Sequence, residues 1–346
     1  MEAVNNTIDK TSAAVAELTS AANAEKTSKV ENPIQYLPVG LFGSTVALAG
    51  LGIAWKQSTA LFGAPPIISL AITVVTCIAF MLLVIGYLTK MVKYPDKVRT
   101  ELNNPVAANF LGTFFISAVL IASLIVPFFL TLARSVWIIG AIGGLVFMFV
   151  LTSRLYRGHL KITDAVPPTL IPGLTVLNTA TAGAVMKWGW FTHEFDLILF
   201  SLGIVYVFVF FVLISYRLIH REPVVTFLVP TLLLMCAPFE VGFMTYMSQV
   251  PQVDMFGSVI FYFGLFIFVV LFFIVFKKGL PFMVSWWGSC FSAGALANAA
   301  IKYANVSQDP LVKDIAIFLL IVLSVMVLIT FALTIRYLAK GKLLMP

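Results

Sequence analysis

Hydrophobic and polar residues alternate along this chain in long blocks. Predominantly apolar segments of about twenty residues, the length of a helix that crosses a bilayer core, are separated by short polar or basic stretches. The pattern predicts ten transmembrane helices and an all-α membrane protein. We expect these helices near residues 36–55, 64–89, 105–127, 135–153, 166–187, 196–219, 223–248, 255–276, 281–303 and 311–338.

Every second apolar segment begins at a proline that follows a polar or basic stretch. The intervals between these prolines are 72, 62, 56 and 58 residues, and each interval contains a second, more apolar segment. Repeats of this kind indicate one structural unit used several times. The sequence therefore predicts five helical hairpins with quasi-five-fold symmetry around a pore. The prolines are Pro33, Pro105, Pro167 with Pro168, Pro223 and Pro281.

The two helices of each predicted hairpin differ in composition. The first is rich in Gly, Ala, Ser and Thr, whereas the second is lipid-like throughout. Small residues let helix backbones approach closely, and hydroxyls and amides need protein or water beside them. We therefore expect an inner ring of odd-numbered helices around the pore and an outer ring of even-numbered ones. A bundle in which the small residues only serve packing is the alternative. Pro172, Pro230 and Pro238 fall within odd helices and favour kinks there.

Composition places nearly the whole chain in the membrane. Of 346 residues, 60% are hydrophobic and 11% charged, and the mean hydropathy is +1.02. We expect one ten-helix transmembrane domain over 35–342, a flexible cytoplasmic tail over 1–34 and a short C-terminal tail over 343–346. A weakly amphipathic helix over 12–24 is the alternative for part of the first tail. Cys77, Cys236 and Cys290 lack pair spacing and are expected to be buried apolar residues.

The net charge of +7 is a signal of topology. Of the 22 Lys and Arg residues, 17 fall in the termini and the even-numbered loops and five in the odd-numbered loops. The positive-inside rule then places both termini in the cytoplasm, with the chain crossing the inner (plasma) membrane. The lipid bilayer is thus an expected partner, and nucleic acid is not.

Motifs for catalysis are absent from the sequence. It contains no phosphate-binding loop, no nucleophile elbow, no Cys-x-x-Cys and no His-Glu-x-x-His, and its three histidines lie in predicted loops or at helix ends. We expect no enzyme activity, no metal, no cofactor and no direct use of ATP.

Phe291 is a candidate gate for a pore. It lies ten residues into the ninth predicted helix, about 15 Å from its start, among small neighbours from Gly288 to Ala295. A bulky ring in such a setting can protrude and close a narrow lumen by steric block and dewetting. An ordinary packing phenylalanine, one of 31, is the alternative. Asn298, further along, offers an amide donor to an anion. The residues expected on or near the same face are Val284, Gly288, Gly294, Ala295 and Asn298.

Glu240 is the only acidic residue well inside a predicted helix. It lies 17 residues past Pro223, or about 25 Å along the seventh helix. Because an intramembrane acid is costly, Glu240 is a candidate proton or selectivity site. The alternative is a carboxylate near an outer vestibule that is hydrated or paired with Lys187 or Lys302.

The ninth predicted helix, SWWGSCFSAGALANAAIKY over 285–303, resembles that of the TehA/SLAC1 anion channel family. The family includes bacterial tellurite-resistance proteins, plant guard-cell channels, fungal malate transporters and sulfite exporters. The segment VGLFG over 39–43 with Ala54-Trp55 resembles the family's first helix. Asn104-Pro105, Pro167 with Pro172, and Glu222-Pro223 resemble the starts of helices three, five and seven. The resemblance covers roughly 34–342.

This resemblance implies a homotrimer with a separate pore in each protomer, occluded by a phenylalanine that corresponds to Phe291. It also implies passive conduction of small monovalent anions such as chloride and nitrate. The residues expected to line the pore on the first and fifth helices are Gly40, Gly43, Ser44, Pro172 and Thr175.

Two main hypotheses for function remain open at this point. The first is a gated anion channel. The second is a proton-coupled carrier of a C4-dicarboxylate or sulfite that uses Glu240, which matches no family motif. A membrane scaffold or receptor is a third reading, and the lack of a sizeable soluble domain disfavours it.

Overall fold

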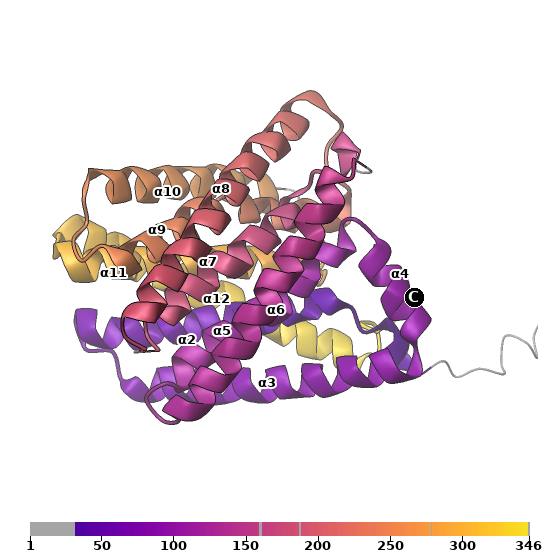
Figure 1. Ribbon diagram of the computed structural model, residues 1–346, viewed down its shortest axis with the longest axis horizontal. Coiled ribbons are helices and arrows are strands. Elements are labelled where there is room, and N and C mark those ends of the chain that lie inside the picture. The colour runs from indigo at the N-terminus through magenta and orange to yellow at the C-terminus, as the bar shows by residue number, and fades with distance from the viewer. Residues whose placement is uncertain (1–31, 159–160, 187, 278, 345–346) are drawn as a thin grey trace, which may run out of the picture.

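The computed structural model describes residues 32–158, 161–186, 188–277 and 279–344, which form helices and contain no strand (Figure 1). Among these residues, eight helical segments are long and apolar enough to cross a membrane. Two more predicted spans are also helical: α7 is short, with 13 residues, and α11 carries Ser, Asn and Lys residues. The prediction of an all-α membrane protein is confirmed.

The elements follow one another in this order: η1 (Pro33–Tyr36), η2 (Val39–Leu41), α2 (Phe42–Phe62), α3 (Pro66–Lys93), α4 (Pro95–Asn103), η3 (Ala107–Leu111), α5 (Gly112–Ile125), α6 (Leu130–Tyr156), η4 (Ile162–Asp164), η5 (Pro167–Leu170), α7 (Ile171–Gly183), α8 (Trp190–His220), η6 (Thr226–Met235), α9 (Ala237–Gln249), α10 (Met255–Phe276), α11 (Trp286–Ser307) and α12 (Pro310–Ala339). The η elements are 3-10 helices.

The helices pack in a closed order. α2 packs against α5, α5 against α7, α7 against α9, α9 against α11, and α11 returns to α2. Each of the remaining long helices packs against two neighbours of this set: α3 on α2 and α5, α6 on α5 and α7, α8 on α7 and α9, α10 on α9 and α11, and α12 on α11 and α2.

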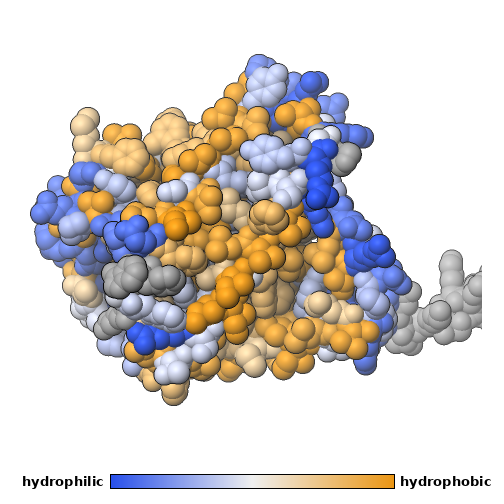
Figure 2. Space-filling model, viewed as in Figure 1, coloured by the Kyte–Doolittle hydropathy of each residue, from blue (hydrophilic) through white to orange (hydrophobic). Residues whose placement is uncertain are grey.

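Burial separates the same two groups of helices. In the most apolar stretch of Thr226–Gln249, 89% of the residues are buried, whereas only 17% are buried in that of Pro66–Lys93. Almost every residue of α7 is buried as well. Hydrophobic side chains cover the middle of the visible surface, and hydrophilic ones gather at its two ends (Figure 2). The lipid-like helices therefore carry their apolar side chains on the outside, where a bilayer would surround them.

Hydrogen bonds between small polar residues join neighbouring inner helices. Thr45 Oγ1 and Ser117 Oγ lie 2.7 Å apart between α2 and α5, and Thr181 and Thr245 join α7 to α9 at 2.9 Å. Between α11 and α2, Asn298 Nδ2 donates to the Gly50 carbonyl at 2.8 Å. Within an apolar environment such bonds fix which helices meet.

Prolines determine how the inner helices begin. Pro230 lies inside η6, and Pro238 occupies the first turn of α9, so the predicted span 223–248 is a 3-10 helix joined to an α-helix. The Pro230 carbonyl accepts a hydrogen bond from Ser289 Oγ at 2.7 Å, which satisfies one group that a regular helix would pair internally. Pro172 lies in the first turn of α7, where a missing N–H is tolerated, so its predicted kink is not inside the helix.

Several predicted boundaries are wrong. α11 begins at Trp286 rather than 281, so Phe291 lies five residues, about 8 Å, into the helix instead of ten. α7 ends at Gly183, earlier than the predicted 187. The short helix α4 was not predicted. Residues 1–31 of the predicted N-terminal tail, with the possible helix over 12–24, lie outside the described residues.

Candidate functional site

Two cavities lie among the buried helices. The first, which we call the wide cavity, has a volume of about 540 Å³ and is bordered by the starts of α2, α5 and α11 and by η6. The second, the narrow cavity, has a volume of about 150 Å³ and is lined by residues further along α2, α5, α7, α9 and α11. All five inner helices thus contribute to one cavity or both.

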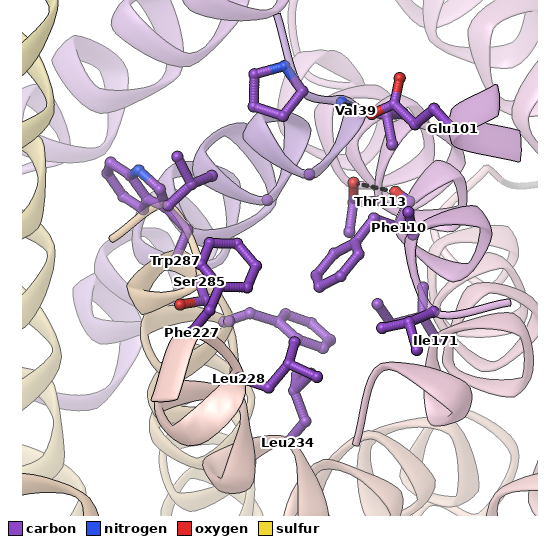
Figure 3. A pocket seen from close by; sticks show the side chains of 18 of the residues that line it. Val39, Glu101, Phe110, Thr113, Ile171, Phe227, Leu228, Leu234, Ser285 and Trp287 are labelled. Carbon is purple, nitrogen blue, oxygen red and sulfur yellow. Dashed lines mark hydrogen bonds between the residues drawn. The ribbon is translucent and has the colours of Figure 1, made fainter. Parts of the chain in front are cut away.

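The wide cavity is mostly apolar. The side chains of Phe110, Ile171, Phe227, Leu228 and Leu234 surround one space and come from separate parts of the chain (Figure 3). The few polar side chains in the lining include a threonine that donates to a backbone carbonyl at 2.6 Å, which the dashed line in Figure 3 marks. This lining offers little that would hold a polar solute tightly.

Glu101 is the only acidic residue in the described lining of the wide cavity. Its carboxylate accepts hydrogen bonds from Lys90 Nζ at 2.7 Å, Val39 N at 2.8 Å and Tyr87 Oη at 3.2 Å. Lys90 also donates to the Leu37 carbonyl at 2.8 Å. The lysine compensates the negative charge, and the network ties α4 and α3 to the start of α2. Sequence analysis did not identify this pair.

The narrow cavity is mostly apolar as well, and three amide and two hydroxyl side chains interrupt its lining. Asn298 uses its amide nitrogen on the carbonyls of Gly50 (2.8 Å) and Gly294 (2.7 Å), so the donor predicted for an anion is already engaged. Gln57 Nε2 donates to Asn298 Oδ1 at 3.0 Å and keeps one N–H. Asn178 Nδ2 likewise donates once, to the Leu174 carbonyl at 2.8 Å.

A cation lies beside the narrow cavity. Lys56 Nζ donates to the carbonyl of Ser123, a residue of the cavity lining, at 3.3 Å. The Lys56 side chain is exposed. Among the described residues, the narrow cavity lining contains no acid. The local electrostatics therefore favour an anion over a cation.

Phe291 and Val46 are the only described residues that line both cavities. Phe291 is 8% exposed and belongs to one hydrophobic cluster with Val46, Leu120, Leu234 and Val241. Phe291 thus borders both cavities and packs within an apolar cluster.

Most of the residues predicted to line a pore border one of the cavities. Ser44, Pro172 and Thr175 are outside both described linings. Ser44 is one residue, or about 100°, around the helix from Gly43, and its hydroxyl donates to the Leu41 carbonyl at 2.7 Å. The residues that do line the wide cavity are Gly40, Gly43, Val284 and Gly288, and those that line the narrow one are Gly294, Ala295 and Asn298.

Pro172 and Thr175 are directed elsewhere by their place in α7. Pro172 is buried in the first turn. The Thr175 hydroxyl donates to the Ile171 carbonyl at 2.8 Å, and a Cβ placed at Gly112 of α5 would contact it. Thr175 therefore belongs to the packing between α5 and α7.

Glu240 lies away from both cavities. It is fully buried, and neither carboxyl oxygen has a hydrogen-bond partner among the described residues. The carboxyl group lies against Gly264 of α10, where an added Cβ would collide with it. Lys302 does not pair with Glu240, since the one ion pair among the described residues joins Lys90 to Glu101. The predicted partner Lys187 lies outside the described residues.

A core of buried helices with central cavities, enclosed by apolar helices, defines a multi-pass helical membrane protein. The chain belongs to the SLAC1 family, described as voltage-dependent anion channels, whose family model matches residues 36–335. The resemblance found in the ninth helix is thereby confirmed.

The curated relatives include proteins of a bacterium and of a plant. A tellurite resistance protein TehA homolog of Haemophilus influenzae is 26% identical over 92% of this chain and 96% of its own length. The guard cell S-type anion channel SLAC1 of Arabidopsis thaliana is 24% identical over 89% of this chain, and the S-type anion channel SLAH3 of the same plant is 24% identical over 86%. The chain spans 57% and 47% of these two plant channels, about half of each.

Proposed function

We propose that this protein is a gated anion channel that conducts small monovalent anions, such as chloride and nitrate. The proposed path runs through the wide cavity, past Phe291, into the narrow cavity. The single observation that carries the proposal is that Phe291 and Val46 are the only described residues shared by both cavity linings. The family description and the names of the plant relatives, which are S-type anion channels, agree with this function.

We propose further that the ten helices form two rings with quasi-five-fold symmetry. The inner ring would consist of α2, α5, α7, η6 with α9, and α11, and the outer ring of α3, α6, α8, α10 and α12. The closed packing order and the position of each outer helix against two inner ones support this arrangement. In such a ring the space at the centre is the natural route for a solute.

The closed state is explained by the apolar constriction. Phe291 and its neighbours offer no hydrogen bond to a hydrated ion, so an ion that enters must lose water without compensation. Gly288 and Gly294 flank Phe291 on the helix, and a Cβ at either position would meet no heavy atom closer than 3.6 Å. The two cavities that Phe291 borders give its ring room to turn aside.

Preference for anions is supported at both ends of the path. The starts of α2, α5, α11 and η6 border the wide cavity, and helix N-termini carry partial positive charge. At the narrow cavity, Lys56 lies close by, and the free N–H of Gln57 can contact an anion. Weak, distributed attraction suits permeation better than tight binding.

The geometry favours a channel over the proton-coupled carrier. Glu240, the acid on which the carrier hypothesis depends, is in contact with α10 and lines neither cavity. Glu101 lies on the path but is paired with Lys90. A Glu240→Gln variant in liposomes separates the two: the channel predicts unchanged anion flux that never exceeds equilibrium, and the carrier predicts loss of pH-driven accumulation.

Thiol accessibility tests the proposed path. Gly288→Cys and Gly294→Cys place a thiol in the wide and the narrow cavity, and both sites tolerate a small side chain. We expect a charged thiol reagent to label the two variants from opposite faces of the membrane, each from one face only. Adding Phe291→Ala should make both thiols reactive from both faces. Labelling of both thiols from one face with Phe291 intact would refute the barrier. The unmodified chain, with its three native cysteines, measures the background.

We also propose a homotrimer in the plasma membrane with cytoplasmic termini. The trimer is an implication of the family resemblance, and the orientation follows from the distribution of Lys and Arg. Native mass spectrometry gives the oligomeric state, and reagent labelling from each face gives the orientation.

A further inference from the structure

A third hollow lies on the outside of the helix bundle, apart from the two cavities. This groove, of about 820 Å³, runs between the outer helices α6 and α8 and over the segment 161–169. Cationic side chains border one end: Arg154 and Arg157 at the end of α6, and Lys161 just beyond it. The other lining residues include the apolar and aromatic Leu155, Tyr206, Phe210 and Leu213 and the polar Asn103, Asn109 and Thr169.

The groove lining on α8, from Tyr206 to Leu213, covers about 10 Å of the helix. Tyr206 lies 14 residues before His220, the end of α8, which corresponds to about 21 Å along the helix. Half of a bilayer core is roughly 15 Å thick. The lining residues Tyr206, Phe210 and Leu213 follow at the spacing of one helix face, and the first two rings lie 4.5 Å apart. The apolar part of the groove therefore fits an acyl chain that enters from the basic end.

The charged end carries more cation than the protein itself neutralises. Arg154 uses one of its N–H groups on the Leu102 carbonyl at 2.8 Å and has others to offer. The only acid in the described lining is Asp164, whose carboxylate accepts from the Lys161 backbone N–H at 3.1 Å. Three positive charges thus face one negative charge.

A second observation points to an anion at the same end. Arg217 follows Leu213 by four residues, so it lies one turn nearer the basic end on the same face of α8. It is 6% exposed, and its Nε and Nη1 have no hydrogen-bond partner among the described residues. Arg217 does not line the groove itself, but a buried positive charge one turn from it is unfavourable, and an anion in the groove would offset that charge.

We propose that the α6–α8 groove binds one anionic phospholipid. The phosphate of the headgroup would interact with Arg154, Arg157 and Lys161, with Arg217 as the buried cation behind them, and one acyl chain would lie along Phe210 and Leu213. Basic pockets between transmembrane helices suit such headgroups. A free phosphate would share the cationic end but leave the apolar part of the groove uncovered, which is why we assign a lipid.

Native mass spectrometry of the full-length protein tests this site, with phosphatidylglycerol and phosphatidylcholine as the two lipid probes. We expect one phosphatidylglycerol to remain bound per protomer and phosphatidylcholine to be lost. The triple variant Arg154→Gln, Arg157→Gln and Lys161→Gln should lower retention about 100-fold. The matched control Arg336→Gln, Lys340→Gln and Lys342→Gln removes equal charge from the end of α12 and should retain the lipid.

Two further arms separate a seated lipid from other sources of binding. Leu213→Trp fills the apolar part and keeps every cation, so it should also release phosphatidylglycerol. Excess inorganic phosphate should not displace the lipid. Equal retention by the triple variant and its control would overturn the proposal, as would full retention by Leu213→Trp, which would indicate surface charge alone. Displacement by phosphate would show an anion site without a lipid. Monodisperse elution of each variant establishes that it is folded.

Discussion

Replacing Phe291 by alanine should open the proposed path. The ring borders cavities of about 540 and 150 Å³, and its removal takes away the one aromatic side chain that both described linings share. In the variant, Val46 is the only described residue that the linings of the wide and the narrow cavity still share. Because existing cavities adjoin the ring on both sides, the new space joins them rather than forming an isolated void.

The expected size of the effect follows from the space released. Truncation of Phe to Ala frees on the order of 100 Å³, room for about three water molecules. A hydrogen bond to a charged group contributes about 1.5–3 kcal/mol. If two such contacts with an ion are restored at the constriction, the barrier falls by about 3 kcal/mol or more, which corresponds to a flux increase of about 100-fold.

Chloride flux into proteoliposomes, followed with an encapsulated halide-quenched dye, measures this effect. Phe268→Ala is the matched control, because Phe268 is 4% exposed in α10 and lines neither cavity. We expect that control to lose stability without a gain in flux. The lowered barrier predicts an increase in flux of about 100-fold. If Phe291→Ala raises flux by less than about threefold at equal incorporation, the ring does not form the barrier.

Three further predictions address charge and packing. Lys56→Gln should lower chloride flux in the Phe291→Ala background about twofold or more, with a larger effect at low ionic strength; a salt-independent change would exclude an electrostatic role. Lys90→Met leaves Glu101 without its cation and should destabilise the fold by about 3 kcal/mol or more, seen as a lower Tm, and Glu101→Gln combined with it should recover part of the loss. Gly264→Ala should lower Tm because its Cβ collides with the Glu240 carboxyl and with Phe239 Cβ, and Glu240→Ala in the same chain should restore part of the loss; additive losses would show that the two do not interact.

The transmembrane helices could be predicted because a bilayer requires long apolar segments and a soluble core does not. Their approximate positions and their order follow from that requirement, whereas the bounds of α7 and α11 do not. The short helix α4 was missed because nine residues of mixed polarity carry no such signal. The sequence did not predict that the span 223–248 begins with the 3-10 helix η6, although Pro230 lies inside that helix.

Residues that line the cavities could be predicted only where one known position allowed the same face of the helix to be followed along the chain. Continuing from Gly40 and Gly43 in steps of three or four residues leads to Val46, Gly50 and Gln57, all of which line a cavity. Composition alone cannot show which face of a helix points to the cavity. Ser44 is small and polar, yet it lies outside both described linings.

Contacts between distant segments stayed beyond sequence reasoning. The orientation of Glu240 depends on the space that Gly264 leaves on another helix. The pairing of Lys90 with Glu101 requires the fold of α4 against α3. Neither partner could be identified from spacing along the chain.

The central claim is that anions pass through a path that Phe291 closes. Its most direct test is the reversal potential of purified Phe291→Ala protein in a planar bilayer under a tenfold gradient of potassium chloride. We expect a current that reverses near the chloride equilibrium potential, about 59 mV in magnitude. Reversal at the potassium potential, or no current above the wild-type level, would contradict it.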